Sequence, residues 1–240
     1  MTAAGFPLAA GDLARYEAAQ ALARESLQAL AAHIRPGATE ASLTEAARHI
    51  MDAKGATGYW WYDMPCVVLA GPRLRVSEEG DVFKPAEIPI GPDDMVTVDV
   101  APEIDGIWGD CARSFFLKGG RLVPPEAAGP EQAEGMAAEA ALHAHLLAVA
   151  RPDMRFQELH ALMAAKLAEL GFENLDFLGN FGHNIGDDLH GRAYMDAACT
   201  LRLDSVPMFT FEPHIAKPGS PLAFKYEEVY RFTDGRLRLL

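Results

Sequence analysis

The chain has 240 residues and a formal net charge of −13, with half of its residues hydrophobic and 23% charged. This length is enough for one large domain or two small ones with a sizeable core. The negative charge argues against a nucleic-acid partner, because phosphate binding needs clustered Lys and Arg.

Membrane and redox signals are absent from the sequence. No apolar run approaches the roughly 20 residues needed to span a bilayer. Residues 1–20 lack a basic region ahead of an apolar one, so they do not read as a signal peptide. The three scattered cysteines show no disulfide or metal-ligand spacing, and we expect reduced thiols packed as small apolar groups. We therefore expect a cytoplasmic protein with no membrane partner.

The first half of the chain predicts two helices and then strands. Residues 10–34 predict an amphipathic helix, which Pro36 ends. Thr39 is a suitable cap for a second helix at about 41–54. Residues 64–70 predict a buried strand. Residues 85–92 predict a turn-rich connector. The stretch MVTVDVAPEIDGIWGDCARSFFL predicts two strands around a turn at Asp105 and Gly106.

The second half begins in the same way, with helices predicted at 130–150 and 156–170 and short strands from Asn174 onward. The segments that start at Ile34 and Ala150 share a pattern without a gap. Its matched positions are Pro36 with Pro152, Leu43 with Leu159 and Gly55 with Gly171. We interpret this as an internal repeat, roughly 19–120 and 135–235, within a single domain of residues 1–240. The alternative is that two Ala-rich helix pairs look alike by composition.

Carboxylates end an apolar strand in each half. Asp99 ends one such strand, and the predicted hairpin would bring Asp110 close to it. In the second half, Phe209 to Pro213 again places a carboxylate, Glu212, after apolar residues, and Glu227 begins the return. Buried carboxylates need a partner or a cation, and two close ones repel. Taken singly, Asp110 and Glu227 would also fit ordinary polar positions.

Between these pairs lies a histidine bracketed by glycines, in Gly182-His183-Asn184-Ile185-Gly186, with His190 seven residues after His183. Glycines let the backbone approach another group closely. One imidazole and four carboxylates would form a mostly oxygen site for two divalent ions. A lone histidine, by contrast, is more often structural.

Together these motifs resemble the pita-bread metallopeptidases, the group of methionine aminopeptidase, aminopeptidase P, prolidase and creatinase. The family's ligand order is Asp, Asp, His, Glu, Glu. It is matched by Asp99 and Asp110 in VTVDVAPEIDGIWGDCARSF, His183 in GHNIG, Glu212 in FTFEP and Glu227 in FKYEE. The resemblance covers nearly the whole chain. It implies an α+β fold with two pseudo-symmetric halves around a curved, mostly antiparallel sheet.

The resemblance also implies roles for these residues. Asp99 would hold one metal, Asp110 and Glu227 would bridge both, and His183 and Glu212 would hold the other. The ions would be Mn, Co, Fe or Zn. Glu212 would also act as the proton shuttle, and His190 would hydrogen-bond the substrate or the tetrahedral intermediate.

The substrate side departs from the family pattern. The family usually has another histidine on the loop after residues 64–70, whereas this loop offers Arg73, Arg75 or Glu78. The family's Arg-x-Glu-Asp is FKYEE here, and its acidic residue after the second histidine is replaced by Gly191 and Arg192. Arg192 is either a surface residue or a ligand for a substrate carboxylate, which would favour a dipeptidase.

An aromatic run formed by Tyr59, Trp60, Trp61 and Tyr62 also bears on the substrate. Trp60, Trp61 and Tyr62 are candidate pocket residues, although core or dimer contacts explain the run equally well.

The expected function is therefore a two-metal exopeptidase that hydrolyses the N-terminal peptide bond of short peptides, with Xaa-Pro dipeptides among the candidate substrates. The alternatives are a methionine aminopeptidase-like enzyme, a metal-free C–N hydrolase like creatinase, and a non-catalytic binding protein on the same fold. A homodimer is compatible with all of them.

Overall fold

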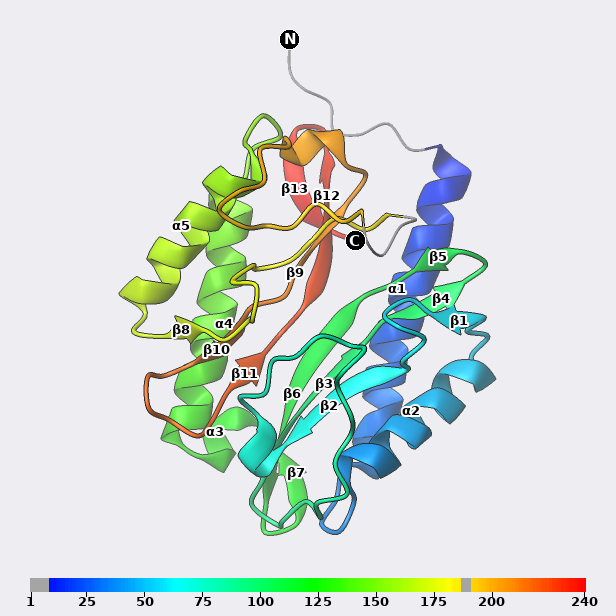
Figure 1. Ribbon diagram of the computed structural model, residues 1–240, viewed down its shortest axis with the longest axis vertical. Coiled ribbons are helices and arrows are strands. Elements are labelled where there is room, and N and C mark those ends of the chain that lie inside the picture. The colour runs from blue at the N-terminus through cyan, green and yellow to red at the C-terminus, as the bar shows by residue number, and fades with distance from the viewer. Residues whose placement is uncertain (1–8, 187–190) are drawn as a thin grey trace.

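The computed structural model describes residues 9–186 and 191–240. Two long helices in each half flank the strands on opposite sides of the molecule (Figure 1). On one flank lie α1 (Ala10–Leu30) and α2 (Glu40–Ala53), and on the other lie α4 (Pro130–Val149) and α5 (Phe156–Glu169). The four helices agree with the expected ones, and a short helix, α3 (Pro125–Ala128), precedes α4.

The first half carries an antiparallel sheet in the order β2-β3-β6-β7. Its strands are β2 (Cys66–Ala70), β3 (Met95–Val100), β6 (Cys111–Lys118) and β7 (Arg121–Val123). The expected hairpin is more divided than the sequence indicates, because β4 (Pro102–Ile104) and β5 (Ile107–Trp108) leave the sheet. They pair with each other, and β4 also pairs with β1 (Gly58–Tyr59). Its turn lies where expected, with positive φ at Asp105 and Gly106.

The second half carries two small antiparallel sheets, in the orders β11-β10-β8 and β13-β12-β9. Their strands are β8 (Glu173–Asn174), β9 (Phe209–Phe211), β10 (His214–Ala216), β11 (Phe224–Lys225), β12 (Glu228–Thr233) and β13 (Arg236–Leu239). Short 3₁₀ turns complete the fold at Ala31–His33, Gly71–Arg73 and Leu203–Ser205. The α+β expectation is confirmed, while the limits of the internal repeat stay a prediction.

Each helix pair packs on the strands of its own half. Buried residues of α1 and α2 form one apolar cluster with β2 and β3, and residues of α4 and α5 form another with β9 and β10. Fully buried aromatics such as Phe156, Phe209 and Phe211 fill the second cluster. This burial of apolar surface is the main force that holds the helices to the strands. Within residues 9–186 and 191–240, no helix is long and apolar enough to cross a membrane.

The start of α2 shows how local sequence and tertiary contact combine. Thr39 and Ser42 form the expected cap, with the Thr39 hydroxyl accepting from the Ser42 amide at 3.1 Å. The buried carboxylate of Glu40 accepts from the amides of Ala70 and Ala86 and pairs with Arg73 at 3.0 Å. Glu40 therefore anchors both ends of the loop that follows β2.

A second buried carboxylate, Glu228, joins the two halves. It begins β12 and is 3% exposed, and it binds Arg24 of α1 at 2.6 Å and also Arg113 of β6. The guanidinium of Arg113 also lies over the ring of Tyr226, 4.1 Å from its centroid. One carboxylate thus ties together a helix, a strand and an aromatic ring from both halves.

Glu228→Gln should lower the free energy of unfolding by on the order of 2–3 kcal/mol. This is less than for a fully enclosed pair, because both arginines are partly exposed. Urea denaturation of the two proteins measures the difference. The matched control is Glu17→Gln, an exposed position on α1 that should change stability by no more than about 0.5 kcal/mol. Equal effects at both positions would show that the Glu228 ion pairs contribute nothing.

Candidate metal centre

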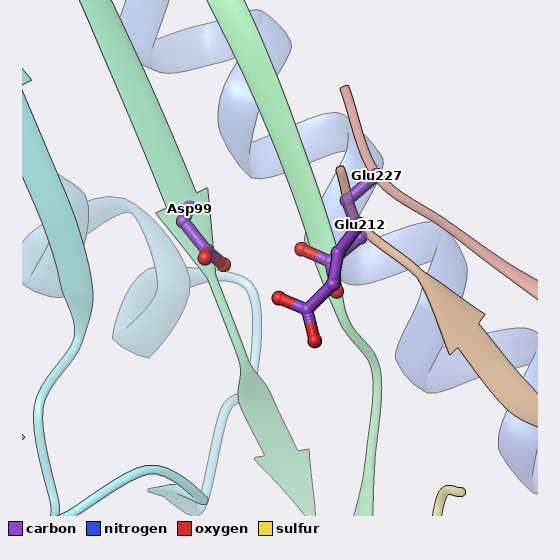
Figure 2. Close-up of side chains that lie close together, drawn as sticks. All are labelled: Asp99, Glu212 and Glu227. Carbon is purple, nitrogen blue, oxygen red and sulfur yellow. The ribbon is translucent and has the colours of Figure 1, made fainter. Parts of the chain in front are cut away.

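The structure brings the five expected ligands together from strand ends of both halves. Asp99 lies in β3, opposite Ala112 of β6, and Asp110 immediately precedes β6. Glu212 directly follows β9, and Glu227 directly precedes β12. Carboxylate oxygens of Asp99, Glu212 and Glu227 lie within 4.8 Å of one another and face a common space (Figure 2).

His183 completes this group from a loop held against β9. Its amide donates to the Thr210 hydroxyl at 3.1 Å, and its Nδ1 donates to the Asn184 carbonyl at 3.1 Å. A Cβ at Gly182 would lie 2.2 Å from the Thr210 carbonyl oxygen, so only glycine permits this approach.

The free nitrogen of His183 faces oxygen atoms that cannot donate to it. Nε2 lies 3.3 Å from Glu212 Oε1 and 3.8 Å from Asp110 Oδ2. Burial lowers the pKa of His183 to about 4, so the ring is neutral at neutral pH. With Nδ1 carrying the proton, Nε2 presents a lone pair to two carboxylates. A cation shared between the three groups would make this arrangement favourable.

The two carboxylates expected to bridge are the least compensated. Glu227 is fully buried, and neither of its carboxylate oxygens has a hydrogen-bond partner among the residues that the structure describes. Burial and then the charge of Asp110 raise the pKa of Glu227 well above its usual range. Burial and then Asp99 do the same for Asp110. Orphaned buried oxygens and neighbouring like charges fit a site for divalent cations.

The position of Asp110 is set by α1. The Gln20 side chain donates from Nε2 to the Asp110 carbonyl at 2.7 Å and accepts from the Asp110 amide at 2.9 Å. A Cβ at Gly109 would lie 2.4 Å from the Ala19 carbonyl oxygen, so the strand approaches the helix closely. Gln20 therefore acts on the site through the backbone, and its place in the helical pattern does not reveal that role.

Lys225 lies within the carboxylate group, although the sequence pattern does not single it out. Its Nζ contacts Asp99 and lies 3.1 Å from Glu212 Oε2. Burial by itself would lower the pKa of Lys225, but Asp99 and Glu212 raise it well above its usual value. Lys225 in turn counters the effect of burial on Glu212, whose pKa is lowered. The one sequence signal for Lys225 is the family motif Arg-x-Glu-Asp, in which an arginine stands at the position of Lys225 in FKYEE.

Four of the five residues, Asp99, Asp110, His183 and Glu212, line one cleft together with aromatic and cationic side chains. Trp60 stacks on Trp108, with centroids 3.7 Å apart, and both rings lie near His183. The guanidinium of Arg192 lies 4.7 Å from the Trp60 centroid and 5.0 Å from that of Tyr194. Trp60, Trp61 and Arg192 all line the cleft.

Of the other expected substrate residues, Tyr62 stands apart from this cleft. Tyr62 is not among the described lining residues; its hydroxyl donates to Glu79 at 3.2 Å. His190 lies outside the described residues.

The three candidate substrate residues on the loop after β2 lie in different surroundings. Arg73 pairs with Glu40, and Arg75 pairs with Glu173 at 2.7 Å, whereas Glu78 lines the cleft. The cleft also contains His214, two residues after Glu212, whose Nε2 donates to the Leu74 carbonyl at 2.8 Å. The sequence pattern does not single out His214, because its partner comes from the other half of the chain.

Solved structures with the same architecture include an X-Pro aminopeptidase and a prolidase. The X-Pro aminopeptidase of Thermotoga maritima matches with a TM-score of 0.78 and 18% identity, over 97% of this chain and 61% of that one. The prolidase of Pyrococcus furiosus matches with a TM-score of 0.78 and 17% identity, over 96% and 64%. These likenesses establish the fold.

Comparisons of sequence also find peptidases. Methionine aminopeptidase 1 of Mycobacterium tuberculosis is 29% identical over 188 residues, which make up 75% of this chain and 66% of that protein. The chain thus spans somewhat less than two thirds of each of these relatives. The model of metallopeptidase family M24 matches residues 14–234, nearly the whole chain. This chain therefore belongs to metallopeptidase family M24.

Proposed function

We propose that this chain is a metal-dependent exopeptidase that hydrolyses the N-terminal peptide bond of short peptides. The observation that carries the proposal is that two groups of this site lack a compensating partner. The buried Glu227 carboxylate has no described hydrogen-bond donor, and the Nε2 lone pair of His183 faces the Glu212 carboxylate. Divalent cations would compensate both groups. His183 lines the cleft that a substrate could enter, and Glu227 lies beside Asp99 and Glu212, which line it too. Membership of a metallopeptidase family supports the same chemistry.

Asp99, Asp110, His183, Glu212 and Glu227 would hold two divalent ions. When bound, such ions polarise the scissile carbonyl and make water a better nucleophile. Their identity among Mn, Co, Fe and Zn is open, because oxygen-rich sites accept several metals.

The chain's own groups would position the reaction. Glu212 accepts from the Thr210 hydroxyl at 3.3 Å, which leaves Glu212 oriented to take a proton from water and pass it to the leaving amine. Lys225 offsets part of the carboxylate charge and ties Asp99 to Glu212. Trp60 and Trp108 cover one side of His183 and exclude water from it. His190 would hydrogen-bond the substrate, as the family resemblance implies.

We propose further that Arg192 binds the carboxylate of a dipeptide. It lines the same cleft as the metal ligands, and its guanidinium lies against Trp60 and Tyr194. A planar guanidinium can bind a carboxylate through two parallel hydrogen bonds. The substrate would then lie between this group and the metal centre, which limits its length to two residues.

A methionine aminopeptidase activity is the second candidate, supported by the likeness to the Mycobacterium tuberculosis enzyme. It would release Met from longer peptides and would not need a carboxylate near the cleaved bond. A non-catalytic binding protein would bind metal without hydrolysing any peptide. A homodimer remains a prediction that no contact in the structure addresses.

Purified protein loaded with Mn²⁺, Co²⁺, Fe²⁺ or Zn²⁺ should hydrolyse at least one peptide among Met-Ala, Ala-Pro, Leu-Pro and Ala-Pro-Ala, with release of the amino-terminal residue followed by mass spectrometry. EDTA should abolish the activity and added metal should restore it. Cleavage of Ala-Pro but not Ala-Pro-Ala supports the dipeptidase, and a preference for Met-Ala supports the alternative. Stoichiometric metal without hydrolysis of a broad dipeptide library would contradict an enzymatic function.

Asp110→Asn should have opposite effects on the metal-free and metal-loaded protein. Without metal it should raise the free energy of unfolding by roughly 1–2 kcal/mol, because it removes a buried charge beside Asp99 and Glu212. It should also remove most of the stabilisation that saturating metal gives the wild type. Chemical denaturation with EDTA and with Mn²⁺ measures both, and Asp12→Asn on the surface of α1 is the control. Destabilisation of the metal-free protein would contradict this account of the site.

Arg192→Met should raise KM for the preferred dipeptide by about tenfold, because a charge-assisted hydrogen bond is lost. The same variant should hydrolyse the corresponding dipeptide amide as the wild type does, since the amide offers no carboxylate. Steady-state kinetics on both substrates gives the comparison, and Arg192→Lys should retain part of the preference. An equal loss on acid and amide would mean that Arg192 supports the cleft rather than recognising the carboxylate.

A further inference from the structure

A second cleft lies between α4 and the C-terminal strands. None of its lining residues lines the cleft with the metal ligands. Met136, Ala140 and Leu147 of α4 form one wall, and Leu239 of β13 forms part of the other. Leu147 is 46% exposed and Leu239 51% exposed, so the apolar rim is open to solvent.

The polar centre of this cleft is Glu139. Glu139 is 0% exposed, and within the described part of the chain neither of its carboxylate oxygens has a hydrogen-bond partner. None of the described residues that line the cleft is a lysine or an arginine. Burial raises the pKa of Glu139 well above its usual range, and the charge of Lys225 lowers it only in part. A buried carboxylate without a partner is costly, so a group that supplies N–H donors would bind here favourably.

The neighbouring polar groups offer acceptors and no free donors. His143 Nε2 lies 3.0 Å from the Tyr226 carbonyl, which can only accept, so Nε2 carries the proton. His143 Nδ1 must then accept from the Tyr230 hydroxyl, 2.6 Å away. Glu228, which also lines the cleft, is already paired with Arg24 and Arg113. An anion would find no cationic partner among the described residues of this cleft.

We propose that this cleft is a binding site for an alkylammonium group, whose N–H donors reach Glu139 while its hydrocarbon chain lies along Met136, Ala140 and Leu147. The Tyr230 oxygen, whose proton is directed to His143, is available as a further acceptor. The apolar walls and the single unpaired carboxylate disfavour a metal ion, which needs several oxygen ligands. Tyrosine rings beside the carboxylate favour an organic cation. The site does not depend on the proposed peptidase activity.

The test uses metal-loaded protein labelled with ¹³C-methyl methionine. Met136 reports on the second cleft and Met64 on the cleft with the metal ligands. Titration with n-pentylammonium chloride should shift the Met136 signal saturably, assigned through its loss in Met136→Leu. The neutral 1-pentanol and KCl at the same concentration should not.

Glu139→Gln should weaken pentylammonium binding at Met136 by at least about tenfold. Glu126→Gln, a change of the same kind at an exposed position of α3, should leave it unaltered. Should Glu139→Gln fail to fold, Ala140→Phe narrows the cleft from its exposed wall and should weaken binding while it retains the carboxylate.

Unchanged affinity in Glu139→Gln, or in Ala140→Phe where that variant is the one used, would overturn the proposal. So would an equal response to 1-pentanol or K⁺, or a response confined to Met64.

Discussion

Four carboxylates share one buried space in this protein, and the cost of holding them there organises much of the structure around it. Asp99, Asp110, Glu212 and Glu227 lie at strand ends, where each backbone is fixed by a sheet. The cation that the chain itself supplies in contact with this described group is Lys225, and His183 is neutral. One ammonium cannot balance four carboxylates in a medium of low dielectric. Divalent ions would offset this repulsion, which is why the proposed function places them here.

The fold meets this requirement by drawing ligands from two halves. Antiparallel pairing of β3 with β6 brings Asp99 near Asp110, and the pairing of β9 with β12 brings Glu212 near Glu227. Contacts around the ligands then restrict their motion. Gln20 holds the backbone of Asp110, and Thr210 contacts both His183 and Glu212. The Glu228 ion pairs join α1 to β12 and β6, so the two halves keep their spacing.

The part of the cleft that would contact a substrate is formed by loops rather than by strand ends. Its residues come from loops, which differ among proteins of one fold more than strands do. Arg73 and Arg75 of the loop after β2 form ion pairs with Glu40 and Glu173, which directs both away from a role in recognition. Glu78, Trp61 and Arg192 are left to line the cleft. In the proposed function, the carboxylate group would thus define the reaction class, and the loops would determine which peptides reach it.

Much of this protein follows from its sequence alone. The helices, the Thr39 cap, the turn at Asp105 and Gly106 and the ligand order were predictable, because they depend on local periodicity, on turn chemistry and on short motifs. The roles of four other residues were not predictable, because their hydrogen-bond or ion-pair partners lie far away in the chain or are missing among the described residues. These residues are Gln20, Lys225, His214 and Glu139. A glutamine on a helix, a lysine in a strand or a glutamate in an Ala-rich helix looks like an ordinary surface residue. Only the tertiary structure shows that Gln20, His214 and Glu139 are buried and that Lys225 is half-buried, and this burial is what makes the partners of their polar atoms matter.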